Sequence, residues 1–157
     1  MDKRGINMVF LKKILVTTDL SEYSLAALEY AFTFGLLYGA RLCLLYVAEH
    51  GHHKNEEQAV AALASFVGKN VDIRLKLDQV VRSGHAAEEI RKFAQEQGID
   101  LIVMTTHGRT GFKHAVLGSV AEKVVRISPI PVLTVKPHPV RESILRFEDI
   151  ETELHLR

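Results

Sequence analysis

The stretch Leu101–Pro137, LIVMTTHGRTGFKHAVLGSVAEKVVRISPIPVLTVKP, decides the fold of this chain. An apolar run at Leu101–Met104 predicts a strand, and a polar, glycine-containing loop follows it from His107 to Leu117. Gly118–Ser119 then opens a predicted helix, and the apolar run at 131–135 returns as a strand. This order is a βαβ unit. Its loop leads into a helix start, where outward-facing N–H groups attract the phosphates of a nucleotide.

Composition indicates a single globular domain with no polyanionic partner. The chain has 157 residues, of which 47% are hydrophobic and 25% are charged. Its formal net charge of +1 gives no reason to expect nucleic acid or an acidic membrane surface as a partner. No apolar run approaches the roughly 20 residues that span a bilayer. The single cysteine, Cys43, fits a reducing compartment, and we expect a cytoplasmic protein.

The rest of the chain alternates strands and helices, which predicts a mainly parallel sheet with helices on both faces. Further strands are expected at 13–18, 41–47 and 71–81. Further helices are expected after the N-cap Ser21, at 56–67 and at 86–97. The second of these should bury Val60, Leu63 and Val67, and the three helices should end at Gly39, Gly68 and Gly98.

Ligands of open parallel sheets bind outside the carboxyl ends of the strands, where the strand order reverses. If the order is 3-2-1-4-5, that point lies between the first strand and the fourth. The loops there are Thr17–Asp19 and His107–Ser119, and they carry a carboxylate and a helix start, respectively. Topology and residue chemistry therefore select the same place.

These loops offer different groups to a nucleotide. Backbone N–H groups of Gly118, Ser119 and Val120 are expected to hold phosphate oxygens, with the Ser119 hydroxyl as a further donor. Gly108 lets the loop bend over the ligand. Phosphates would repel Asp19, so its carboxylate should face ribose hydroxyls, the base or Mg²⁺.

Apolar and basic residues complete the candidate site. Val47 and Met104 are expected to contact the base. His107 and Arg109 either add positive charge near the phosphates or belong to a solvated loop surface. No P-loop, no GxGxxG after the first strand and no GxSxG motif occurs in the chain.

The spacing of Gly108, nine intervening residues and Gly118-Ser119 resembles the nucleotide loop of the universal stress protein family, in its ATP-binding branch. KKILVTTDLSEYSLAALEYA resembles that family's first strand and helix. HAAEEIRKFAQEQGIDLIVM and LGSVAEKVVRISPIPVLTVKP resemble its third helix with the fourth strand and its end. The resemblance extends over residues 12–137.

The resemblance implies a three-layer α/β sandwich with a five-stranded, mainly parallel sheet of order 3-2-1-4-5, a Rossmann-like fold of the adenine nucleotide alpha hydrolase type. It implies contacts of Asp19 with the nucleoside and of Gly118 and Ser119 with phosphates, and Thr17 and Thr18 directly precede that aspartate. The sequence departs from the family pattern at Thr105, where a glycine is usual. A β-branched side chain there narrows the space beside the backbone.

We therefore expect residues 1–137 to form a nucleotide-binding domain, with 138–157 as a C-terminal extension. The expected ligand is ATP, ADP or AMP, with or without Mg²⁺, held by a homodimeric stress-response regulator with little or no turnover. One alternative is a nucleotide-free dimeric interaction protein of the same fold. Another is a slow ATPase, or a protein that phosphorylates its own Ser119. The exposed edge strand at 132–135 is the expected dimer contact, and the alternative is that the tail after Pro137 covers this edge instead.

Two other features leave alternatives open. After Pro137 the chain has apolar residues at loosely helical spacing, Ile144, Phe147, Ile150 and Leu154. They predict either a helix packed on the body or a docking segment for a second subunit or partner. The cluster His50, His52 and His53 is interpreted as a solvated loop rather than a metal site, because no nearby cysteine or helical HxxxH spacing completes it.

Overall fold

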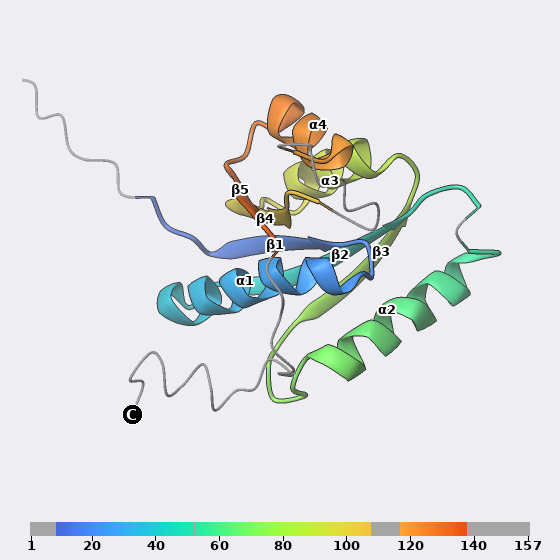
Figure 1. Ribbon diagram of the computed structural model, residues 1–157. Coiled ribbons are helices and arrows are strands. Elements are labelled where there is room, and N and C mark those ends of the chain that lie inside the picture. The colour runs from blue at the N-terminus through green and yellow to red at the C-terminus, as the bar shows by residue number, and fades with distance from the viewer. Residues whose placement is uncertain (1–8, 52, 108–116, 138–157) are drawn as a thin grey trace, which may run out of the picture.

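The computed structural model describes residues 9–51, 53–107 and 117–137 of the chain (Figure 1). Strands and helices alternate along it: β1 (Lys13–Thr18), η1 (Glu22–Ser24), α1 (Leu25–Tyr38), β2 (Arg41–Ala48), α2 (Glu56–Asn70), β3 (Asp78–Ser83), α3 (Ala86–Glu96), β4 (Leu101–Thr105), α4 (Ser119–Ile127) and β5 (Val132–Val135). No helix within these described ranges is long and apolar enough to cross a membrane.

The five strands form one sheet in the order β3-β2-β1-β4-β5, and every neighbouring pair is parallel. Helices α1 and α2 cover one face of the sheet, and α3 and α4 cover the other (Figure 1). The predicted three-layer sandwich and its strand order are therefore confirmed. In this order β1 lies between β2 and β4, so the chain reverses its direction of growth at the boundary between β1 and β4.

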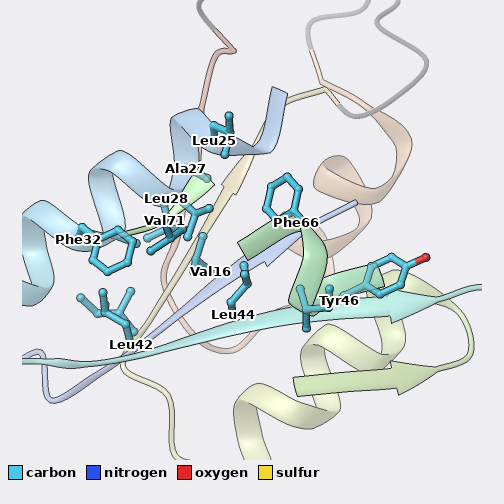
Figure 2. Packing of buried hydrophobic residues seen from close by; sticks show 14 of the residues in the cluster. Val16, Leu25, Ala27, Leu28, Phe32, Leu42, Leu44, Tyr46, Phe66 and Val71 are labelled. Atoms are coloured by element: carbon cyan, nitrogen blue, oxygen red, sulfur yellow. The ribbon is translucent and has the colours of Figure 1, made fainter. Parts of the chain in front are cut away.

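Alternation along β1 builds two separate cores. Ile14 and Val16 face α1 and α2, and Leu15 faces α3 and α4; all three are fully buried. Figure 2 shows part of the first cluster, in which Val16 and Leu44 of the sheet meet residues of α1. A strand that is buried on both faces needs apolar residues at successive positions, which explains the continuous apolar runs in β1 and β2.

The prediction of a strand over 71–81 was partly wrong, because β3 begins only at Asp78. A turn precedes it, in which the Asp72 carboxylate accepts a hydrogen bond from the backbone N–H of Arg74 at 3.0 Å. Ile73 is consequently 98% exposed, although it continues the apolar alternation of Val71 and Leu75. A local aspartate turn thus competes successfully with the strand pattern.

The inner face and the end of the second helix also differ from the prediction. Helix α2 continues to Asn70, so Gly68 lies inside it rather than at its end. Its buried residues are Ala59, Leu63 and Phe66, whereas Val60 is exposed. Large Phe66 takes the inner position, and the buried face is rotated by one residue from the predicted one. The other two predicted helix ends are confirmed by the positive φ angles of Gly39 and Gly98, 64° and 60°.

Candidate functional site at the carboxyl edge of the sheet

A cavity of about 400 Å³ opens at the carboxyl edge of the sheet, where the strand order reverses between β1 and β4. Its wall includes nine of the residues predicted for the site: Thr17, Thr18, Asp19, Val47, Met104, Thr105, Gly118, Ser119 and Val120. His107 is not among the lining residues. Gly108 and Arg109 lie outside the described residues. The two loops that the sequence selected therefore do meet at one hollow.

Gly118 brings the start of α4 directly against the end of β4. Its N–H donates to the Thr106 carbonyl oxygen at 2.5 Å, and a Cβ added to Gly118 would lie 2.8 Å from the same oxygen. The φ angle of Gly118 is −68°, which any residue can adopt. Glycine is thus required here for space and not for conformational freedom, because a side chain would collide with a backbone atom that cannot move aside cheaply.

The N–H groups of Ser119, Val120 and Ala121 in the first turn of α4 have no carbonyl partner within the helix. The next N–H, of Glu122, is the first to bond back, to the Gly118 carbonyl at 2.9 Å. All three residues line the cavity. A helix start of this kind carries a partial positive charge of about half an elementary charge. The groups that face the hollow therefore suit an anion.

Helices α2 and α3 differ from α4 at their starts. The Asn55 side chain accepts from the Gln58 N–H at 2.9 Å and caps α2. The Glu49 carboxylate accepts from the Ala86 N–H at 3.3 Å at the start of α3. At α4 the N-cap position is Gly118, which has no side chain to cap the helix. Of these three starts, α4 is the one whose N-cap residue has no side chain.

The loop after β1 is held by a chain of hydrogen bonds. The Ser24 hydroxyl donates to the Ser21 carbonyl at 2.7 Å, so the Thr18 hydroxyl must donate to Ser24 Oγ, 2.7 Å away. Thr18 Oγ1 in turn accepts from the Leu20 N–H at 2.9 Å. Leu20 has a φ of 65°, a left-handed conformation that costs a non-glycine residue energy. The surrounding hydrogen bonds stabilise this turn and fix the position of Asp19 between Thr18 and Leu20.

Asp19 presents its carboxylate at the cavity in a defined orientation. Its Oδ1 accepts from the Ser21 N–H at 3.0 Å and from the Ser21 hydroxyl at 2.5 Å. Ser21 was predicted to cap the following helix, but its side chain makes no such bond and orients Asp19 instead. Holding one carboxylate oxygen in place suits recognition of a hydroxyl or a cation.

Thr105 occupies the position where the resemblance suggested a glycine. Its hydroxyl donates to the His107 carbonyl oxygen at 3.1 Å, and the residue lines the cavity. The neighbouring Thr106 Oγ1 lies 2.8 Å from Nδ1 of His107. The two threonines thus both contact His107, the second residue after β4. The Thr105 hydroxyl is therefore engaged with the loop backbone at the wall of the hollow.

Sequence reasoning missed eight lining residues: Ser24, Leu45, Tyr46, Glu49, Ala86, Ile90, Thr106 and Ala121. The strand register indicates one of these residues, Tyr46, because it pairs with the predicted site residue Thr18 across β2 and β1. Tyr46 is buried at the end of β2, and Figure 2 shows its hydroxyl pointing away from the core cluster. That residue becomes predictable once the strand order is known.

The Tyr46 hydroxyl lies 2.8 Å from Nε2 of His53, and the two rings meet edge to face at a centroid distance of 5.6 Å. The expectation of a wholly solvated histidine loop is therefore wrong for His53, which anchors the loop after β2 to the cavity wall. Within the described part of the chain, no cluster of three or more histidine, cysteine or acidic side chains is arranged to hold a metal ion. His52 lies outside that part.

Comparison with known proteins places this geometry in a family. The model of the Universal stress protein family matches residues 11–136. Universal stress protein MJ0577 of Methanocaldococcus jannaschii is 31% identical, over 82% of this chain and 96% of its own. Universal stress protein MJ0531 of the same organism is 32% identical, over 80% of this chain and 82% of its own.

Solved structures repeat the fold. The structure of MJ0577 superposes with a TM-score of 0.72 at 33% identity, over 84% of this chain and all of that one. A universal stress protein in complex with cAMP gives a TM-score of 0.63 at 23% identity, covering 81% of this chain and 98% of its own. A universal stress protein of Archaeoglobus fulgidus in complex with dAMP gives 0.61 at 21% identity, covering 82% of this chain and all of its own. At these last two identities the likeness concerns the fold.

Proposed function

This chain belongs to the universal stress protein family, and we propose that the cavity at the carboxyl edge of its sheet binds an adenine nucleotide. The observation that carries the proposal is the start of α4. The residues of its first turn, Ser119, Val120 and Ala121, line the cavity, Gly118 provides no capping side chain, and Asp19 lines the same hollow. A phosphate and a nucleoside need these two kinds of group side by side.

In this proposal the phosphates lie at the start of α4. The N–H groups of Ser119 and Val120 hold phosphate oxygens, and the Ser119 hydroxyl adds a donor. His107, Gly108 and Arg109 belong to the loop that leads into this helix, and we assign them to the phosphate side of the ligand. Glycine at position 118 allows the helix start to sit close against β4.

The nucleoside lies on the side of β1 and β2. Asp19 accepts hydrogen bonds from the ribose hydroxyls, or binds Mg²⁺ when the cation accompanies the phosphates. Thr17, Val47 and Met104 line the cavity between the strand ends, and the last two offer an apolar wall to the base. Two proteins of the same fold have been solved with cAMP and with dAMP, both of which combine an adenine base with a phosphate. They support an adenine nucleotide as the class of ligand, with ATP, ADP or AMP as candidates.

We further propose that the protein acts in the cytoplasm as a homodimeric regulator of the stress response. The edge strand β5, Val132–Val135, pairs with β4 on one side and presents its other side to a second copy. An edge strand rich in β-branched residues is a template for pairing. Light scattering on a Leu133→Lys variant tests this contact. A loss of the dimer supports it, and an unchanged mass contradicts it.

Calorimetric titration with ATP, ADP, AMP and adenosine, each with and without Mg²⁺, tests the nucleotide proposal. The proposal predicts binding of at least one phosphorylated ligand and a weaker response to adenosine, because adenosine leaves the α4 N–H groups without an anion. Mass spectrometry of small molecules released from freshly purified protein adds an independent check. No heat with any nucleotide at millimolar concentration would contradict the proposal.

A second candidate function is favoured by Thr105, whose side chain narrows the cavity beside the backbone. Here the protein is a nucleotide-free dimer that acts by binding other proteins, and the loop after β4 is structural. A Thr105→Gly variant distinguishes the two. If wild type binds no nucleotide and the variant does, Thr105 has closed the site; if both bind, the second candidate fails.

A further inference from the structure

Helix α1 is apolar on its outward face as well as on its buried face. It has one charged residue, Glu29, in its 14 residues. Leu28, Ala31 and Phe32 face the core, yet Tyr30, Leu37 and Tyr38 on the other side are 44, 54 and 59% exposed. A helix that is apolar all round is normally covered on all sides. The outward face of α1 therefore requires a covering element.

Two exposed tyrosines and the partly buried Phe34 between them form a continuous aromatic stripe. Tyr30, Phe34 and Tyr38 recur at a spacing of four residues, which places them on one helix face. Their rings follow one another at centroid distances of 6.3 Å and 6.4 Å. Leu37 lies one turn after Phe34 and widens the stripe. We call these four residues the α1 stripe.

Elsewhere in the described chain, Val9 and Phe10 are adjacent exposed residues before β1, and the other large exposed apolar side chains are scattered. Of the nine, Tyr23 and three members of the α1 stripe come from η1 and α1. Ile73 lies on the turn before β3, and Val60 and Val125 lie on different helices. Single exposed apolar residues need no explanation, whereas a contiguous group marks a contact surface.

We propose that the C-terminal extension, residues 138–157, covers the α1 stripe of its own chain. The extension follows β5, whose last residue, Val135, is buried in the core cluster that contains Leu25 and Leu28 of α1. Because β5 and β1 are both parallel to β4, the extension starts at the carboxyl edge, where α1 also starts. The family match ends at residue 136, so this covering element lies beyond the shared fold.

The length and pattern of the extension fit this role. After a link of six residues, 138–143, the remaining stretch 144–157 equals α1 in residue number. As a helix it would span about 21 Å, the length of α1 itself. Its apolar residues Ile144, Phe147, Ile150 and Leu154 recur three or four residues apart, a spacing that gives a helix an apolar face and matches an apolar partner.

Acetylation of tyrosine by N-acetylimidazole, measured per peptide by mass spectrometry, tests the proposal in the full chain. The test variant is Phe147→Asp with Leu154→Asp, which places charges on the apolar face of the extension. The control variant is Ile73→Asp, because it makes the same kind of change at a fully exposed site. Buried Tyr46 reports on the folded state and should stay unreactive in all three proteins.

The proposal predicts that Tyr30 and Tyr38 react several-fold faster in the test variant than in wild type or the control. In wild type, the slower acetylation of Tyr30 and Tyr38 must not change with protein concentration. Equal rates in all three proteins would overturn the proposal, because the extension would then leave the stripe uncovered. Protection that weakens on dilution of wild type would also overturn it and identify a second copy as the covering element.

Discussion

Two hollows among the described residues lie at opposite edges of the same sheet and have similar volumes, about 320 Å³ at the amino edge and about 400 Å³ at the carboxyl edge. At the amino edge the charged groups already have partners. Arg41 Nε lies 2.6 Å from the Asp78 carboxylate, and Lys13 Nζ donates to the Gln97 carbonyl at 2.9 Å. At the carboxyl edge the first N–H groups of α4 have no partner within their helix.

Helix polarity explains the difference. In parallel βα units the helices start at the carboxyl edge and end at the amino edge, so N–H groups collect at one edge and carbonyl groups at the other. Helix α3 receives one protein hydrogen bond near each end, from its Ala86 N–H to the Glu49 carboxylate at its start and from Lys13 to the Gln97 carbonyl just past its end. The N-cap of helix α4 is Gly118, which has no side chain to bond its first N–H groups. Under the proposed function, the glycine-capped helix start, and not the size of the hollow, distinguishes the edge that binds the nucleotide.

Replacing Gly118 with valine should have the largest effect. The new side chain would meet the Thr106 carbonyl and push the start of α4 away from β4. We expect nucleotide binding to fall below detection at millimolar ligand, with a stability loss of about 1–3 kcal/mol, as for overpacked sites. Calorimetry and thermal unfolding measure both.

A matched glycine provides the control. Gly68 lies inside α2, and a Cβ added there meets nothing within 4 Å. Gly68→Ala should bind nucleotide like wild type and be more stable by about 0.5–1 kcal/mol. If Gly118→Val binds nucleotide with unchanged affinity, the site at α4 is ruled out.

Asp19→Asn should weaken nucleotide binding by about tenfold, because a charged acceptor of ribose hydroxyls is replaced by a neutral one. The amide oxygen can still accept from Ser21, so the loop should keep its shape. Titration of wild type and variant with ATP and with 2′,3′-dideoxy-ATP, which lacks the ribose hydroxyls, shows whether Asp19 acts through those hydroxyls. Wild type should prefer ATP and the variant should lose most of that preference; a preference that survives in the variant would remove Asp19 from ribose recognition.

Ser119→Ala should have a smaller effect, since it removes one neutral hydroxyl and leaves the backbone N–H groups in place. We expect a loss of about 0.5–1.5 kcal/mol in binding free energy, the value of one hydrogen bond. Calorimetry with AMP and ATP measures it. A loss as large as that of Gly118→Val would mean that the hydroxyl, and not the helix start, carries the phosphate contact.

Changes at the amino edge should have the smallest effect on nucleotide binding. The double variant Arg41→Gln with Asp78→Asn removes an exposed ion pair that lines the other hollow. Because surface pairs contribute little, the variant should keep its affinity and nearly its full Tm. A clear loss of nucleotide affinity would show that the ligand contacts the amino edge.

The Cys43 thiol at the same edge reports on that hollow by its reactivity. Burial, and then the nearby Asp78 carboxylate, raise its pKa to about 11. We therefore expect alkylation by iodoacetamide at pH 8 to be far slower than for a free thiol. The unfolded chain deprotonates first as pH rises, so the Cys43 contribution to stability should fall between pH 9 and 11. Comparing Tm with Cys43→Ala over this range isolates the effect.

Much of the fold follows from the sequence because strong periodic signals agree with one another. The apolar runs of β1, β2 and β4, and the glycine stops at Gly39 and Gly98, lie where the pattern predicts them. The start of β3 was predicted wrongly, because a turn at Asp72 interrupts the apolar alternation that indicated a strand from residue 71. Local side-chain bonds of this kind are not visible in periodicity.

The site was predictable as a place and less so as a set of contacts. The loops around Asp19 and Gly118 could be selected because topology brings strand ends together. The contacts of Glu49 with α3 and of Tyr46 with His53 could not be predicted in this way. They depend on the exact end of β2 and on the path of the loop that follows it. Likewise, glycine at 118 was expected to admit the ligand, and the structure adds the approach of the Thr106 carbonyl as its reason.

Amide chemical shifts recorded by NMR during titration with ATP, and separately with adenosine, test the central claim most directly. The account predicts that ATP moves the Ser119 and Val120 amide signals, and that adenosine leaves these two nearly unchanged while it moves signals near Asp19 and Val47. Shifts confined to Lys13, Arg41 and the rest of the amino edge, or no shifts with ATP at all, would contradict it.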